Sequence, residues 1–137
     1  MSLVLDASMA LAWLFEDERG PAEQTILDRV RMDGAIVPSL WRLEVANVLR
    51  YAVLRQRSTE KLAAANLADL TELPIALDDE TNRHAWGRTR ELANEYRLSV
   101  YDATYLELAL RRKLPLASRD GELNRAARRA RVEVLAG

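Results

Sequence analysis

The chain opens on a short apolar run that ends on a carboxylate, Leu3-Val4-Leu5-Asp6. A continuous apolar run of this length suits a strand that is covered on both faces, as in the middle of a parallel sheet. The segment Ser8–Phe15 then becomes helical in character, so Asp6 falls where a strand gives way to a helix. Open α/β sheets place their ligand sites at the carboxyl ends of their strands. Asp6 is therefore expected either to cap the following helix or to bind a metal ion.

Short apolar runs alternate with helical segments along the rest of the chain. Strands are expected at 3–5, 35–37, 73–77, 114–117 and 132–135, and helices at 8–18, 21–32, 40–57, 60–70, 78–97, 101–113 and 122–131. Strands that are separated by one or two helices predict a mainly parallel sheet between helix layers. The 137 residues contain no repeat or linker. We therefore expect one α/β domain over residues 1–137.

Composition excludes several classes of protein. The chain has no cysteine, which rules out disulfides, thiol catalysis and thiolate metal sites. No apolar run approaches the ~20 residues that cross a bilayer, and the N-terminus lacks the pattern of an export signal. We therefore expect a cytoplasmic protein without a membrane partner.

Charge is unevenly distributed although the net charge is only −1. The segment 111–131 contains eight bases against two acids, Asp120 and Glu122. Such a segment fits a phosphate backbone or an acidic partner, and it equally fits a solvated helix face.

Three further carboxylates fall at comparable places in the predicted elements. Asp120 follows the strand at 114–117, Glu44 lies in the first turns of the 40–57 helix, and Asp102 begins the 101–113 helix. Each could be a helix cap or a rim residue when taken alone. In a parallel sheet, however, the carboxyl ends of strands and the N-termini of the following helices share one edge. Asp6, Glu44, Asp102 and Asp120 are therefore expected together, with Arg42 and Arg119 as the bases that could neutralise some of them.

Four carboxylates in one pocket repel one another, and a divalent cation resolves the conflict. An all-oxygen site suits Mg²⁺ or Mn²⁺, and the lack of cysteine with only one histidine disfavours zinc. Such a metal can activate water and hold a phosphodiester, so nuclease chemistry follows naturally. Phosphatase or other phosphoryl-transfer chemistry would use similar ligands.

Four motifs together resemble those of the PIN-domain family, and more closely the VapC toxins of type II toxin–antitoxin pairs. The motifs are Asp6-Ala7-Ser8, the run Pro38–Leu49 (PSLWRLEVANVL), Tyr101-Asp102-Ala103 and Ser118-Arg119-Asp120. The resemblance covers the whole chain and implies a three-layer α/β/α fold. It also implies a Mg²⁺- or Mn²⁺-dependent endoribonuclease whose acids correspond to Asp6, Glu44, Asp102 and Asp120.

The same resemblance implies supporting groups and partners. Ser8 and Ser118 would assist the acids, Ser118 standing where the family usually has threonine, and Asn47 adds a polar group one turn after Glu44. The implied partners are an RNA substrate, a VapB-like antitoxin, a second copy in a homodimer and, through the antitoxin, operator DNA. The competing hypothesis is a PIN-like binding module with weak or no nuclease activity.

Overall fold

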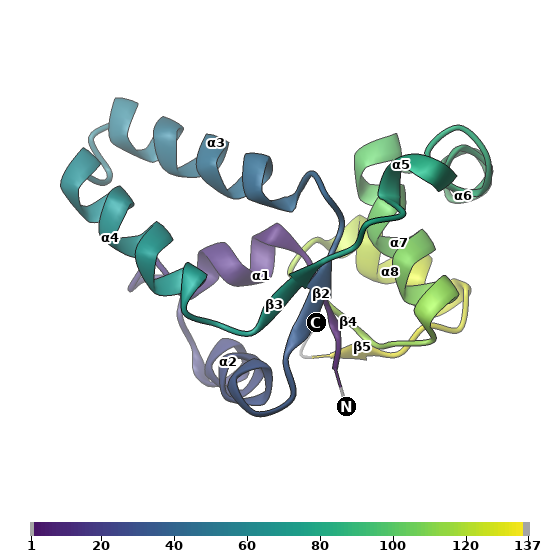
Figure 1. The fold of residues 1–137 in the computed structure, drawn as a ribbon, viewed down its shortest axis with the longest axis horizontal. Helices are drawn as coiled ribbons and strands as arrows, with labels where there is room; N and C mark the ends of the chain where they lie inside the picture. The colour runs from purple at the N-terminus through teal and green to yellow at the C-terminus, as the bar shows by residue number, and fades with distance from the viewer. Residues whose placement is uncertain (1, 136–137) are drawn as a thin grey trace.

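The computed structural model describes residues 2–135 and shows one sheet with helices on both sides (Figure 1). In chain order the elements are β1 (Val4–Leu5), α1 (Ala7–Ala12), α2 (Pro21–Asp33), β2 (Ala35–Val37), α3 (Trp41–Leu54), α4 (Glu60–Thr71), β3 (Ile75–Leu77), α5 (Thr81–His84), α6 (Arg88–Tyr96), α7 (Val100–Arg112), β4 (Leu116–Ala117), α8 (Gly121–Arg129) and β5 (Val134–Leu135). The predicted α/β class with a central parallel sheet is confirmed.

The strand order is β3-β2-β1-β4-β5, and every neighbouring pair is parallel. The chain first winds outward from β1 to β2 and β3, with α1 to α4 on one side of the molecule (Figure 1). It then crosses to β4 on the other flank of β1, and α5 to α8 lie on the opposite side. The direction of winding therefore reverses between β1 and β4. In open α/β sheets such a reversal opens a crevice at the carboxyl ends of the two strands.

The opening apolar run forms the centre of the core. Leu3, Val4 and Leu5 are completely buried, and β1 contacts both β2 and β4. Burying a side chain of this kind stabilises a fold by roughly 1.5–3 kcal/mol. Because α7 also packs on β1 and β4, the strand that ends at Asp6 is held from both flanks and from the helix layer.

Two predicted helices differ from the structure. The helix expected at 8–18 ends at Ala12 and gives way to turns. The helix expected at 78–97 is divided into α5 and α6 by a turn that ends at Gly87, whose φ of −106° and ψ of −105° lie outside the helical region. Glycine is a poor helix former, so a break at this position costs little.

No helix within residues 2–135 is both long and apolar enough to span a membrane.

Candidate active site

Asp6 lies at the end of β1, where the winding of the sheet reverses, and its side chain is 5% exposed. The hydroxyls of Ser8 and Ser118 both donate to its Oδ2, at 2.6 and 2.7 Å. Asp6 occupies the N-cap position of α1, but its side chain makes no capping hydrogen bond there. Burial raises the pKa of Asp6, the two serine hydrogen bonds oppose that rise, and the negative charge of Asp120 adds to it. The carboxyl is thus fixed in position but costly to ionise without a cation.

Asp120 has a structural role as well as its place beside Asp6. It is the N-cap of α8, where its Oδ1 accepts the Leu123 amide at 3.0 Å. Its own amide donates to the Ser118 hydroxyl, and the Arg119 amide donates to Ser8 Oγ. These bonds tie the turn after β4 to the turn after β1, so both predicted serines are part of one hydrogen-bonded frame around Asp6.

Glu44 reaches the same region from the first turn of α3. It accepts a short hydrogen bond on Oε1 from the hydroxyl of Tyr105, a fully buried residue of α7. Burial raises the pKa of Glu44, the bond from Tyr105 opposes that rise, and the charges of Asp6 and Asp102 add to it. Burial and the neighbouring Asp6 and Glu44 also raise the pKa of Tyr105, so the phenol keeps its proton and acts as the donor.

The role of Tyr105 was not predicted. In the sequence it counts only as one of the apolar positions that follow Asp102 at helical spacing. The available signal was its hydroxyl, because a tyrosine on a buried stripe usually needs a polar partner for its OH group.

Asp102 completes the group from the first turn of α7, whose N-cap is Ser99. Its pKa is raised to about 6, first by burial and then by the charges of Asp120, Asp6 and Glu122. Within residues 2–135, no lysine or arginine forms an ion pair with Asp6, Glu44, Asp102 or Asp120. Arg119, one of the expected neutralising bases, pairs with Glu18 at 2.8 Å instead.

The sequence interpretation of α3 needs one correction. The helical spacing of Leu40, Val48 and Tyr51 around Glu44 predicts a sheltered apolar stripe, but Val48 and Tyr51 are exposed. The buried face of α3 is instead formed by other positions, Trp41, Val45, Leu49 and Ala52. Glu44 therefore lies at the margin of the buried face. The side chain of Asn47 is exposed and makes no hydrogen bond within residues 2–135, so nothing ties it to the acids.

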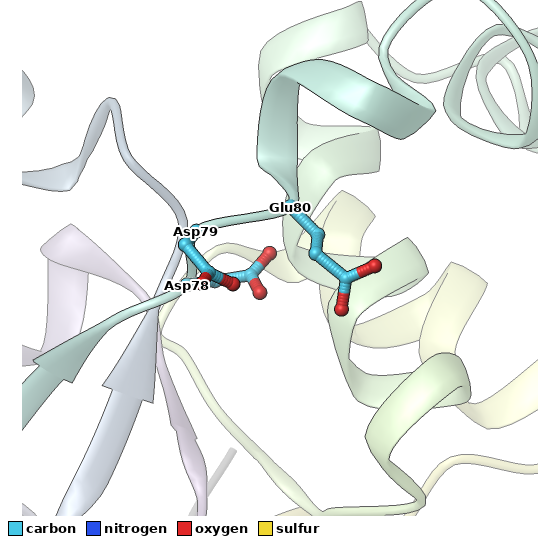
Figure 2. Close-up of side chains that lie close together, drawn as sticks. All are labelled: Asp78, Asp79 and Glu80. Atoms are coloured by element: carbon cyan, nitrogen blue, oxygen red, sulfur yellow. The ribbon is translucent and has the colours of Figure 1, made fainter.

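A second acidic cluster follows β3 (Figure 2). The carboxylates of Asp78, Asp79 and Glu80 have oxygens within 4.8 Å of one another, which no other group of three acids or histidines in residues 2–135 achieves. The four predicted acids are thus neighbours in the electrostatic sense but are more widely spaced than these three.

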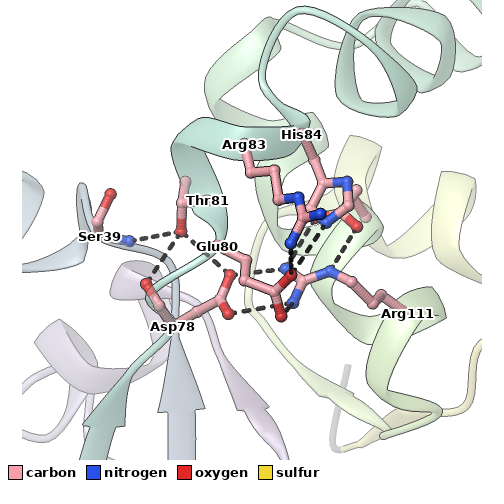
Figure 3. Close-up of polar contacts among 8 residues, drawn as sticks. Ser39, Asp78, Glu80, Thr81, Arg83, His84 and Arg111 are labelled. Carbon is pink, nitrogen blue, oxygen red and sulfur yellow. Dashed lines mark hydrogen bonds and ion pairs between the residues drawn. The ribbon is translucent and has the colours of Figure 1, made fainter.

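The second cluster already has its counter-charge. Arg111 forms ion pairs with Asp78 at 2.6 Å and with Glu80 at 3.5 Å, and Thr81 donates to Asp78 (Figure 3). Burial opposes ionisation of Asp78, but the guanidinium outweighs it and holds the pKa of this carboxyl below its usual range. A cation would have to displace Arg111, so this cluster is a poorer candidate than the group around Asp6.

The donor set around Asp6 fits a hard divalent cation. It consists of carboxylate oxygens whose charges oppose one another, and no basic side chain relieves them. Both serine bonds end on Oδ2 of Asp6, so Oδ1 receives no side-chain hydrogen bond from the described residues. Oxygen donors in this number and charge are those that Mg²⁺ and Mn²⁺ prefer.

Comparison with protein-family models decides the family. The model of the PIN domain matches residues 3–129. The chain belongs to the PIN-domain family. The match covers β1 to α8 and all four acids of this PIN domain, and it confirms the resemblance seen in the motifs. None of the functionally curated protein sequences matches this PIN domain.

Solved structures share the fold of this PIN domain at low sequence identity. VapBC2 from Rickettsia felis, solved with a promoter DNA fragment, has a TM-score of 0.67 and 11% identity, over 98% of this chain and 97% of that one. PAE2754 from Pyrobaculum aerophilum has a TM-score of 0.64 and 21% identity, over 92% and 84%. VapC20 from Mycobacterium tuberculosis, described as a sarcin-ricin loop cleaving toxin, has a TM-score of 0.59 and 17% identity, over 90% and 94%. VapC toxins are thus among the structural neighbours of this chain.

Proposed function

We propose that this PIN domain is a divalent-metal-dependent endoribonuclease and the toxin of a type II toxin–antitoxin pair. PIN domains are nucleases, and one structural neighbour, VapC20, is described as a sarcin-ricin loop cleaving toxin. The observation that carries the proposal is the placement of Asp6. A nearly buried carboxylate at the reversal of the sheet is held by two serines and surrounded by three acids without a basic partner.

The four acids would have different roles in binding the cation. Asp6 and Asp102 would hold the principal cation, and Glu44 and Asp120 would assist directly or through water. A bound Mg²⁺ or Mn²⁺ would supply an activated water and neutralise charge on the phosphodiester. The protein's own part is orientation: Ser8 and Ser118 hold Oδ2 of Asp6, Tyr105 holds Oε1 of Glu44, and the Leu123 amide holds Oδ1 of Asp120. Supporting hydrogen bonds of this kind keep ligands in place before the metal arrives.

The names of the structural neighbours support an antitoxin as a partner of the proposed toxin. VapBC2 from Rickettsia felis and FitAcB from Neisseria gonorrhoeae, the latter with a TM-score of 0.58 and 19% identity, are solved under names that pair two proteins. We extend this to an antitoxin that covers the acidic site, a homodimer of this chain, and operator DNA bound through the antitoxin. The charge of the acidic site favours a basic side chain of the antitoxin as the group that occupies it.

The decisive experiment measures RNA cleavage by the purified, partner-free chain. Wild type, Asp6→Asn and Asp102→Asn are incubated with total RNA in Mn²⁺, in Mg²⁺ and in EDTA. We expect metal-dependent cleavage by the wild type and at least about 100-fold slower cleavage by either variant, because each loses a ligand charge. Asp79→Asn serves as the matched control, since it changes an acid of the second cluster and should leave cleavage intact.

Two results would contradict the proposal. Cleavage that survives in Asp6→Asn and Asp102→Asn would place the chemistry elsewhere. A wild-type protein that leaves RNA intact in both metals but binds a basic partner would favour the binding-module hypothesis instead.

A further inference from the structure

The bases of the segment 111–131 have different surroundings in the folded chain. Arg111 is engaged by Asp78, Glu80 and Glu107, and Arg119 is engaged by Glu18. Arg112 is the last residue of α7 and Lys113 is its C-cap, about ten residues and hence ~15 Å from Asp102 at 1.5 Å per residue. Among the bases of α8, Arg125 is the nearest to the acids, about five residues and hence ~7.5 Å along the helix from Asp120.

Two of these α8 bases meet a third arginine from another part of the chain. Arg125 and Arg129 line an open hollow with Tyr96 and Arg97 at the end of α6. The guanidinium of Arg129 lies 5.6 Å from the centre of the Tyr96 ring. We call this feature the arginine hollow. Arg97 lies outside the segment that the sequence marked as basic, so only the fold reveals the group.

The arginine hollow carries excess positive charge. None of Arg97, Arg125 and Arg129 forms an ion pair within residues 2–135, and all three are exposed. The acids beside them are Glu122, which lines the hollow, and Glu95, which precedes Tyr96 in α6 and whose charge adds to the effect of burial in raising the pKa of the Tyr96 hydroxyl. Arg125 lies in the middle of α8, where the helix dipole gives no reason for a cation.

The arginine hollow adjoins the acidic site. Glu122 lines the hollow, and its charge also acts on Asp102 across the start of α8. Asp120 and Arg129 mark the two ends of α8, about 14 Å apart at 1.5 Å per residue. One strand of nucleic acid can therefore span from the acids to the arginines along a single helix.

The surface chemistry of the arginine hollow favours RNA over a protein partner. Protein interfaces have an apolar core, yet none of the exposed large apolar side chains lies on α6 or α8. Seven of them lie on α3, α4 and β3, which occupy the other side of the molecule (Figure 1): Leu43, Val48, Tyr51, Leu54, Leu62, Leu67 and Leu77. Exposed arginines around an aromatic ring are the groups that bind phosphates and bases of single-stranded RNA.

We propose that the arginine hollow binds the sugar–phosphate backbone of the RNA substrate on one side of the cleaved bond. This inference rests on the proposed nuclease function and adds the path of the substrate. The hollow supplies affinity without sequence preference, and the acids supply the reaction.

The test compares the full-length wild type with the triple variant Arg97→Gln/Arg125→Gln/Arg129→Gln. Binding of a labelled single-stranded RNA of roughly 12 nucleotides is measured in EDTA over a range of salt. We expect about tenfold weaker binding at ~0.1 M salt, and a slope of log K against log salt that is lower by about 2, because each phosphate contact contributes ~0.7 for single strands. In Mn²⁺, KM should rise by a similar factor while kcat stays unchanged. Arg112→Gln, at the far end of α7, is the control and should change neither quantity.

The outcomes separate this inference from the proposed function. An unchanged salt slope, or a loss in kcat with KM constant, overturns the arginine hollow while cleavage by the wild type stands. Normal RNA binding by the variant together with weaker inhibition by an acidic antitoxin segment would assign the hollow to a protein partner and also overturn it. If the triple variant shows the expected change in salt slope but the wild type does not cleave RNA, the inference about the arginine hollow stands and the proposed nuclease function is contradicted. If the wild type binds no RNA, both are contradicted.

Discussion

Asp102 makes the stability of the metal-free protein depend on pH. Its pKa of about 6 in the folded chain lies above the ordinary value of 3.8. The folded state therefore holds this proton more tightly than the unfolded chain does, so the associated stability is fully present below about pH 4 and is lost as the pH rises through about 6.

Asp102→Asn should remove this loss. We expect the variant to be more stable than the wild type by about 1 kcal/mol near pH 7.5 in EDTA, since solvent screening reduces the full electrostatic cost at a half-buried site. Thermal melts between about pH 4.5 and 7.5 measure the difference, which should shrink toward the acid end. Glu72→Gln, at the exposed end of α4, is the control. A variant less stable than the wild type at neutral pH would contradict the unfavourable charge at Asp102.

Tyr105→Phe tests the orientation of Glu44. The variant keeps the buried ring and removes only the hydroxyl that donates to Oε1 of Glu44. We expect the Mn²⁺ concentration for half-maximal cleavage to rise about tenfold, as is typical for loss of a group that orients a metal ligand. Tyr101→Phe removes an exposed hydroxyl from the first turn of the same helix and should leave the metal requirement unchanged. Equal metal requirements in both variants would show that Glu44 needs no support from Tyr105.

At the scale of residues, the sequence pattern predicts where the four acids lie but not which hydrogen bonds orient them. An acid at the end of a strand or the start of a helix is visible in the sequence, because the position follows from the pattern of elements. The bond from Tyr105 to Glu44 joins residues 61 apart in the chain, so it depends on how α7 packs beside α3. Asn47 follows Glu44 by three residues, which places it about 60° further around α3 from the buried face and turns it to solvent. A rotation of this size at the margin of a helix depends on how the helix packs and is not visible in the spacing.

Arg111 links two elements that are distant in the chain. It bonds to Asp78 in the segment after β3 (Figure 3). It also bonds to Glu107, one turn earlier in α7. The side chains of Asp78 and Glu107 are only 2% and 5% exposed, so neither can exchange its partner for water. Removing one member of such a group leaves buried charges uncompensated.

Arg111→Ala is therefore expected to destabilise the fold by about 3 kcal/mol. Urea denaturation should show a lower midpoint with an unchanged m-value, since the surface exposed on unfolding stays the same. Arg112→Ala, the exposed neighbour, should change stability by less than about 0.5 kcal/mol. A small loss in Arg111→Ala would mean that Asp78 and Glu107 take up protons or water instead.

At the scale of elements, the existence and order of strands and helices were predictable and their ends were not. The strands contain only two or three residues each, so their ends depend on the register with neighbours rather than on a local pattern. The break between α5 and α6 has a local cause in Gly87, but a single glycine also occurs inside continuous helices. Ser99 is a case that local chemistry does explain, since its hydroxyl accepts the Asp102 amide at the start of α7.

A metal ion should stabilise the whole molecule through the acids around Asp6. A ligand that binds only the folded state adds about 2.7 kcal/mol at a hundredfold excess over its dissociation constant. We expect Mn²⁺ to raise the melting temperature of the wild type and of Asp79→Asn, and to have little effect on Asp6→Asn. If Mn²⁺ instead raises the melting temperature of Asp6→Asn but not of Asp79→Asn, the metal site is the cluster after β3.

At the scale of the whole molecule, the class of fold was predictable from the sequence, but the arrangement of basic side chains on the surface was not. The basic segment 111–131 looked like one feature, yet the fold assigns Arg111 and Arg119 to ion pairs and brings Arg97 to Arg125 and Arg129. Which charges remain available depends on the distances between elements, and these distances are a property of packing rather than of spacing along the chain.

The four proposed ligands are divided between the two ends of the sequence. Asp6 and Glu44 precede residue 50, whereas Asp102 and Asp120 follow residue 100, and β1 cannot pair with β4 until residue 117 exists. The proposed nuclease would therefore lack part of its ligand set until residue 120 has been synthesised, and a cut between α3 and α7 would divide these ligands between two fragments. Completion of the second half of the site would be the step that makes the proposed toxin able to attack the RNA of the cell that produces it.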